Sequence, residues 1–285
     1  MDKEKKTDKR KTAGSVPDIE KTIDDLTLFN NELMCKVFDR NIAATEYLLR
    51  TILQRDDITV LDVKGQYNMQ NPLIGGRSIT LDILARTKGG KRTDIEVQLD
   101  SEGSHIRRAR FHSSMLDVRM LKEGQKFKHL KDSYVIFIYR RDKFRKGLPV
   151  YHVNRYVNET GKEFGDGSHI IYVNGSYKAD DAMGRMLHDF RSKRSKDMYN
   201  KELAESIRHF KESEEGRNKM KDPVMEYAKA AEERGEKRGE RKGERKTRIL
   251  DIKNMMKNMG CTLEQALDAL EVEGKDRAMI IGKIK

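Results

Sequence analysis

The sequence predicts an α/β (α+β) fold, in which a mixed central sheet is flanked by helices and followed by a charged helical C-terminal tail. Segments rich in β-branched and aliphatic residues alternate with segments whose apolar residues recur at helical spacing. Two of the strand-like segments are joined by a glycine-containing turn, which is typical of an antiparallel hairpin. The nearly continuous apolar run at 134–139 is typical of a strand covered on both faces.

The chain length limits the size of the core, and the net charge indicates the kind of partner. A chain of 285 residues can bury one substantial core and still carry appendages. Its 59 basic and 47 acidic residues leave a net charge of +12, which favours polyanions such as nucleic acid. Cys35 and Cys261 lie far apart, which suits a reducing compartment and argues against a thiolate zinc site. Because no apolar run approaches about eighteen residues, we expect a soluble, cytoplasmic protein that does not enter membranes.

The amino-terminal segments predict an arm followed by helices. Residues 1–17 are mostly charged or small and polar, so we expect a disordered basic arm. Apolar residues then recur at helical spacing from 26 to 52. They predict one long helix, or two helices joined near 39–41.

The next segments predict strands. Residues 58–62 indicate a short strand, and the Asn-Pro and Gly-Gly pairs within 71–76 predict an irregular loop after it. Residues 78–86 and 93–99 are rich in β-branched and aliphatic side chains. The glycines of the turn at 88–91 predict that these two strands form an antiparallel hairpin.

Helices and strands continue to alternate in the second half of the body. Residues 104–122 show apolar residues at a helical repeat, with arginines alongside. Two further strands are expected at 149–156 and 169–174. Residues 179–212 predict a polar helical segment.

The tail contains a repeat of four residues at 231–248, with glycines at its regular positions. A step of four returns to nearly the same helix face, so we expect its charges to pair along a marginal helix or linker. Thr262 and Gln265 have the spacing of a capping box and open a small helix at 263–270. These patterns divide the chain into four parts: a disordered basic arm (1–17), a main domain (18–230), a charged glycine-containing linker (231–248) and a small helical segment (249–285).

A constellation of polar residues interrupts the predicted hairpin. Because side chains alternate along a strand, Asp82 is expected on the face opposite Leu81 and Ile83. The same alternation puts Glu96 and Gln98 on one face of the next strand. Carboxylates among aliphatic residues are costly unless they are paired or bind a cation. Two of them on adjacent strands therefore predict a site for Mg²⁺ or Mn²⁺, which prefer oxygen ligands.

Strand alternation alone leaves a simpler alternative open. Asp82 and Glu96 could form edge-strand ion pairs with the basic residues nearby, namely Arg77, Lys91 and Arg92.

Four motifs then occur in a fixed order. They are Arg77-x-x-x-Leu81-Asp82-Ile83-x-Ala85, a glycine-containing turn, Ile95-Glu96-Val97-Gln98, and Arg108-x-x-Phe111-His112-x-Ser114. Over about residues 22–230 this set resembles the recombination-promoting nuclease/putative transposase family of the PD-(D/E)xK superfamily. The resemblance implies a restriction-endonuclease-like fold and an enzyme that hydrolyses DNA phosphodiester bonds with a metal-activated water.

The resemblance also implies a role for each matching residue of the hairpin. Asp82 and Glu96 correspond to the metal-binding acids, and the carbonyl of Val97 to a further metal ligand. Gln98 stands where much of the superfamily has lysine, so it can place the water but supplies no positive charge.

Further positions match outside the hairpin. Arg108, Ser114 and Arg77 correspond to contacts with the DNA substrate, whereas His112 is interpreted as structural. An additional acid from the amino-terminal helices is expected, and both Glu32 and Glu46 remain candidates.

Two functions follow from these patterns. The first is a Mg²⁺-dependent DNA endonuclease associated with recombination and transposition. The alternative is a catalytically weak or inactive nucleic-acid-binding or assembly module that retains the nuclease fold, because Gln98 and the charged tail both allow it. The tail is also a candidate surface for homo-oligomers, although its repeat lacks the apolar positions of a coiled coil.

Overall fold

The structure, a computed structural model, describes residues 18–89, 92–98 (backbone only) and 106–284. The predicted disordered arm at 1–17 lies outside the described residues. Two compact units make up the chain, Met1–Val224 and Met225–Lys285. Among the described residues, no helix combines the length and hydropathy needed to cross a membrane.

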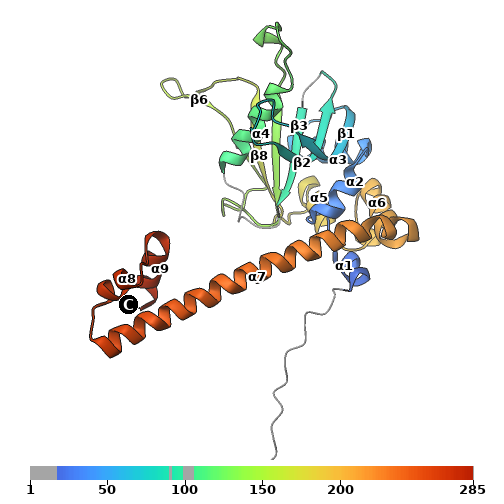
Figure 1. The fold of residues 1–285 in the computed structure, drawn as a ribbon. Helices are drawn as coiled ribbons and strands as arrows, with labels where there is room; N and C mark the ends of the chain where they lie inside the picture. Colours follow the sequence, from blue (N-terminus) through green and yellow to red (C-terminus); the bar gives the residue numbers. More distant parts are fainter. Residues whose placement is uncertain (1–17, 90–91, 99–105, 285) are drawn as a thin grey trace, which may run out of the picture. The chain divides into compact units, whose positions relative to one another are not determined.

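A mixed sheet forms the centre of the first unit (Figure 1). It has six strands, in the order β1-β2-β3-β4-β8-β5. The first three strands are antiparallel, β3, β4 and β8 run parallel, and β5 returns antiparallel to β8. The predicted mixed sheet and the predicted hairpin are therefore confirmed. The strands are β1 (Val60–Met69), β2 (Ile79–Thr87), β3 (Arg92–Gln98), β4 (Ser133–Tyr139), β5 (Val150–Val153) and β8 (Ser168–Asn174).

Helices cover both faces of this sheet. One face packs against α1 (Ile19–Asp25), α2 (Asn31–Phe38), α3 (Ile42–Leu53), α5 (Ala182–Arg191) and α6 (Lys201–Glu212) in the larger core. The other face packs against α4 (Ile106–Val118) in a second core. The β4 residues from 135 to 139 are all buried, as expected for a strand covered on both sides.

The helix break predicted near 39–41 is confirmed, and of the two alternatives the chain forms two helices. Arg40 takes a left-handed conformation with φ of 57°. The side chain of Asn41 then caps α3 by accepting a hydrogen bond from the backbone N–H of Ala44.

Two predicted stretches differ from the structure. β1 continues to Met69, whereas a loop was expected after 62, because Gly65 and a run of polar residues hide its alternation. At Gly65 the backbone of α2 comes so close that an added Cβ would lie 2.6 Å from the carbonyl oxygen of Cys35. The predicted helix at 179–212 is interrupted between α5 and α6, where the buried carboxylate of Asp189 accepts hydrogen bonds from two backbone N–H groups.

A small hairpin was not predicted. β6 (Tyr156–Val157) and β7 (Lys162–Glu163) pair as a separate two-stranded sheet between β5 and β8 in the chain. Its residues are exposed, so no burial pattern marks it in the sequence.

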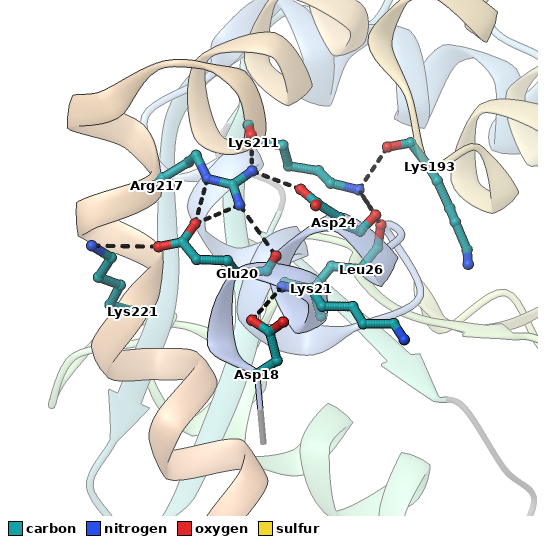
Figure 2. A network of polar contacts seen from close by, with 9 residues as sticks. All are labelled: Asp18, Glu20, Lys21, Asp24, Leu26, Lys193, Lys211, Arg217 and Lys221. Atoms are coloured by element: carbon teal, nitrogen blue, oxygen red, sulfur yellow. Dashed lines mark hydrogen bonds and ion pairs between the residues drawn. The ribbon is translucent and has the colours of Figure 1, made fainter. Parts of the chain in front are cut away.

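A buried lysine ties α1 to the rest of the first unit, as Figure 2 shows. The Nζ of Lys211 on α6 donates to the carbonyl oxygens of Asp24 and Leu26, both at 2.7 Å, and of Lys193 at 2.6 Å. The last carbonyls of a helix have no partner within the helix, so the ammonium caps the end of α1. Arg217 adds ion pairs to Asp24 at 2.7 Å and to Glu20 at 2.5 Å.

The second unit is helical. The long helix α7 (Glu214–Met259) begins in the first unit and continues into the second, where α8 (Leu263–Ala269) and α9 (Gly274–Ile284) follow. The capping box of Thr262 and Gln265 is confirmed. A small separate core is formed by Ile252, Ala266, Leu267, Val272 and Ile280.

The charged repeat at 231–248 is helical within α7, but the predicted pairing of its charges is wrong. No ion pair joins two members of the repeat in this stretch, all of which the structure describes. A repeat of four stacks like on like, as with Glu236 above Glu240 and Arg241 above Arg245. Each such contact costs about 0.2–0.5 kcal/mol, so the repeat opposes its own helix.

Candidate active site

The apolar side chains of β2 switch from one face of the sheet to the other at Asp82. Before this residue, Leu81 packs in the core beneath α4, whereas Ile83 packs in the core on the opposite face of the sheet. The expectation that Leu81 and Ile83 share a face is therefore wrong. In β1 the residue between the partners of Leu81 and Ile83 is Gln66, which takes a left-handed φ of 48°.

Because of this switch, the regular alternation of side chains along a strand does not apply at Asp82. The residue is only 8% exposed. Its carbonyl oxygen accepts a hydrogen bond from the Cys35 thiol of α2 at 3.2 Å. Asp82 thus lies where the strand turns from one core to the other and where an amino-terminal helix touches the sheet.

Backbone register relates Asp82 to the predicted partner strand. The last register pair towards Asp82 joins Ile83 to Ile95, so the next position along each strand is Asp82 on β2 and Glu96 on β3. The parallel pairing of β3 with β4 puts Glu96 beside Phe137. A pair of acidic positions across the hairpin is what oxygen ligation of a divalent cation needs.

The rest of the predicted metal site lies outside the described side chains. This applies to the side chains of Glu96, Val97 and Gln98, and their meeting with Asp82 remains a prediction. The described side chains contain no cluster of three His, Cys, Asp or Glu residues suited to a metal. The set of described side chains does not include Glu96.

Arg108 reaches the same part of the sheet from α4. Its Nε donates to Nε2 of His112 at 3.3 Å, and its guanidinium carbon lies 5.9 Å from the centroid of the Phe137 ring. Because Phe137 neighbours Glu96 in register, α4 brings a half-buried cation towards the predicted acids. His112 is 3% exposed and packs 6.2 Å from the same ring, which agrees with a structural role.

Two of the predicted substrate contacts share a cavity, and the third does not. Arg77 and Arg108 line a cavity of about 490 Å³, together with Thr80 of β2 and Arg107. Ser114 is exposed elsewhere on α4, and its hydroxyl donates to the carbonyl oxygen of Arg110 at 3.1 Å. Ser114 lies six positions after Arg108, which corresponds to about 240° around a helix and explains the difference.

The two candidate acids from the amino-terminal helices have different surroundings. Glu46 accepts a hydrogen bond from the backbone N–H of Val60 at 2.8 Å and pairs with Arg50 at 3.3 Å. It therefore holds the beginning of β1. Glu32 lies on α2, one turn before Cys35, whose thiol contacts the Asp82 carbonyl.

One basic residue near the site was missed in the sequence. Lys143 follows β4, and its Nζ lies 4.9 Å from the centroid of the Tyr139 ring and 5.9 Å from that of Tyr172. Partial burial lowers the pKa of Lys143, because desolvation penalises the charged ammonium. Tyr139 is the register neighbour of Gln98. The three basic residues within 140–143, at the carboxyl end of a covered strand, were the available signal.

Comparison with known proteins gives one match. A family model described as PD-(D/E)XK nuclease family transposase matches residues 38–258. The match extends from the end of α2 through the whole sheet and into α7, and it includes the hairpin of Asp82 and Glu96. No curated protein and no solved structure matches the chain.

Proposed function

Since the chain belongs to the PD-(D/E)XK nuclease family of transposases, we propose that it is a metal-dependent DNA endonuclease. One observation supports the proposal: the hairpin register runs to Ile83 and Ile95, and the next position along each strand is Asp82 and Glu96, where the side chains of β2 switch faces of the sheet. Asp82, Glu96 and the Val97 carbonyl would hold the cation. A Mg²⁺ or Mn²⁺ ion bound there lowers the pKa of a water and offsets negative charge on the phosphate.

The chain's own residues would bind and orient the DNA. Arg77 and Arg108 line one cavity beside β2, and guanidinium groups suit phosphate oxygens because they donate in a forked geometry. The hydrogen bond and ring contact of Arg108 restrain its side chain before substrate arrives. Arg107 lines the same cavity and joins these contacts. Ser114 does not line this cavity, so we leave it out of the proposed site.

Two further residues complete the proposed site. Glu32 is the better candidate for the additional acid, because it lies on α2 one turn before Cys35, whose thiol contacts the Asp82 carbonyl. Lys143 supplies positive charge beside the strand position of Gln98, which has an amide in place of an ammonium. Replacing Lys143 by Gln should lower the cleavage rate, and Lys143→Arg should restore part of it.

The direct test is Asp82→Asn in the full chain, assayed on labelled DNA with Mg²⁺ and with Mn²⁺. We expect cleavage to be lost and DNA binding to be kept. Asp62→Asn is the matched control, since Asp62 lies on the adjacent strand β1 and the change removes the same charge. Manganese binding, followed by calorimetry, should weaken only in the Asp82 variant.

Gln98 is the specific reason to consider the alternative function, a nucleic-acid-binding module without cleavage, because its amide supplies no positive charge. A wild-type protein that binds DNA but stays inert with both ions would overturn the endonuclease and support a nucleic-acid-binding module. Equal loss of cleavage in the Asp82 and Asp62 variants would show that Asp82 has no special role.

A further inference from the structure

One face of α7 carries a row of arginines that the nuclease site does not use. Counting 100° per residue, they fall within an arc of about 80°. Four glutamates of the same segment lie at least about 100° from the middle of this row, and Glu244 lies about 80° from it. We call this row the arginine stripe, and it consists of Arg234, Arg238, Arg241, Arg245 and Arg248.

The stripe is exposed and only partly neutralised. Every residue from 232 to 248 is exposed. Arg245 pairs with Asp276 of α9 at 3.1 Å, and the guanidinium of Arg234 lies 5.9 Å from the Tyr227 ring. In the described part of the chain, Arg238, Arg241 and Arg248 form no ion pair. Three of the stripe arginines line one surface hollow of about 410 Å³, which Glu244 and Asp276 also line.

The charge pattern is not that of a helix that stabilises itself. A self-supporting charged helix places Glu and Lys or Arg four residues apart, so that opposite charges meet. Most four-residue steps here join like charges, as with Arg234 and Arg238 or Glu240 and Glu244, and only Glu233–Lys237 and Glu244–Arg248 join opposite charges. An anionic partner along the stripe would remove the repulsion among the arginines and leave all of the glutamates except Glu244 facing away from it.

We propose that the arginine stripe binds the phosphate backbone of double-stranded DNA, outside the nuclease fold and independently of cleavage. Arginine donates to phosphate in a forked geometry, which a lysine cannot match. The stripe spans about 21 Å at 1.5 Å per residue, which is the rise of about six base pairs.

A duplex fits the stripe better than a lipid surface does. Helices that lie on membranes insert an apolar face between the headgroups. The segment 232–248 contains no apolar side chain, since its only uncharged residues are three glycines and one threonine, so it has nothing to insert. Phosphates in a regular row remain the complementary partner.

The test compares two double variants of the full chain that lose the same charge. Arg238→Gln with Arg241→Gln removes two members of the stripe, and Lys242→Gln with Lys246→Gln removes two cations outside it. Binding of a fluorescent duplex is measured by anisotropy in EDTA, so that no cleavage occurs. Circular dichroism checks that both variants keep their helix content.

We expect the arginine variant to weaken binding about tenfold at low salt. It should also reduce the slope of log K against log salt by about 2, since each phosphate contact contributes about 0.9. The lysine variant should change the slope by less than about 1. Equal effects of the two variants, or none, would overturn the stripe as a binding surface.

Vesicles containing anionic lipid provide the second arm. Loss of vesicle binding with unchanged DNA binding in the arginine variant would also overturn the proposal and assign the stripe to membranes. Because these measurements need no catalysis, an inert nuclease site would leave their outcome interpretable.

Discussion

Lys211 and the arginine stripe are both positive charges on helices, yet their surroundings are opposite. Lys211 is 5% exposed, and three carbonyl oxygens accept its hydrogen bonds. The stripe is exposed, and three of its arginines have no ion pair within the described chain. A buried charge is tolerated only when acceptors are supplied, and it then fixes the fold. An exposed charge without partners adds nothing to the fold and remains available for binding.

The largest effect should come from removing the buried charge. Lys211→Met leaves the carbonyls of Asp24, Leu26 and Lys193 without their donor, because methionine fills the space but donates nothing. We expect a loss of about 3 kcal/mol in the free energy of unfolding of the first unit. Thermal unfolding followed by calorimetry should show a midpoint lower by about 10 °C.

Lys221→Met is the control for this prediction. Its Nζ pairs with Glu20 at 3.5 Å, and its side chain is 44% exposed. Exposed ion pairs contribute about 0–1 kcal/mol, so the midpoint should hardly move. A similar drop of the midpoint in both variants would show that the buried Lys211 contributes no more to the free energy of unfolding than an exposed lysine does.

Proton linkage gives a second, smaller effect at the same residue. Burial lowers the pKa of Lys211 to about 8, from an ordinary value of 10.5. Between these values the unfolded chain binds more protons than the folded chain, so stability from this group rises with pH. Below pH 8 both states are protonated, and the gain is absent.

The measurement is the difference in stability between wild type and Lys211→Met across this pH range. The difference should grow by about 1–3 kcal/mol from pH 8 to pH 10.5, because each unit of pKa shift corresponds to about 1.4 kcal/mol. A difference that stays constant would mean that carbonyl acceptors hold the pKa of Lys211 near its ordinary value. Other lysines and the tyrosines titrate in both proteins and cancel.

The contrast between the two regions also explains which structural features could be predicted from the sequence. Local chemistry predicted the hairpin, the strand at 134–139, the helix break at Asn41 and the capping box at Thr262. Each depends on residues within a few positions of one another.

Features that depend on contacts between residues far apart in the sequence could not be predicted from it. The change of side at Asp82 accompanies a left-handed residue in the facing strand, Gln66, and strand alternation in β2 alone cannot show it. The carbonyls that accept from Lys211 come from α1 and from the segment before α6. Likewise, Lys143 reaches the site only because β4 lies beside β3.

The candidate site divides in the same way. The acids were indicated by polar residues in an apolar hairpin, which is a local signal. Arg108 and Arg77 came from the family resemblance, and the structure places both on one cavity. Ser114 came from the same resemblance but points elsewhere, since a motif does not specify the face of a helix.

The smallest predicted effect concerns glycines, and its sign should differ between the two regions. An added Cβ at Gly239 on α7 meets nothing within 4 Å, and its φ is not positive. Gly239→Ala should therefore stabilise this helix by about 1 kcal/mol, because alanine loses less conformational freedom on folding than glycine does.

At Gly184 on α5 an added Cβ would lie 1.7 Å from the Ala179 carbonyl oxygen, so Gly184→Ala should destabilise the first unit. Amide hydrogen exchange resolves both regions in one experiment: slower exchange at 231–248 is expected for the first variant and faster exchange around α5 for the second. Unchanged exchange in the first variant would mean that like-charge repulsion, rather than glycine, limits the helix, and high salt should then slow exchange in wild type and variant alike.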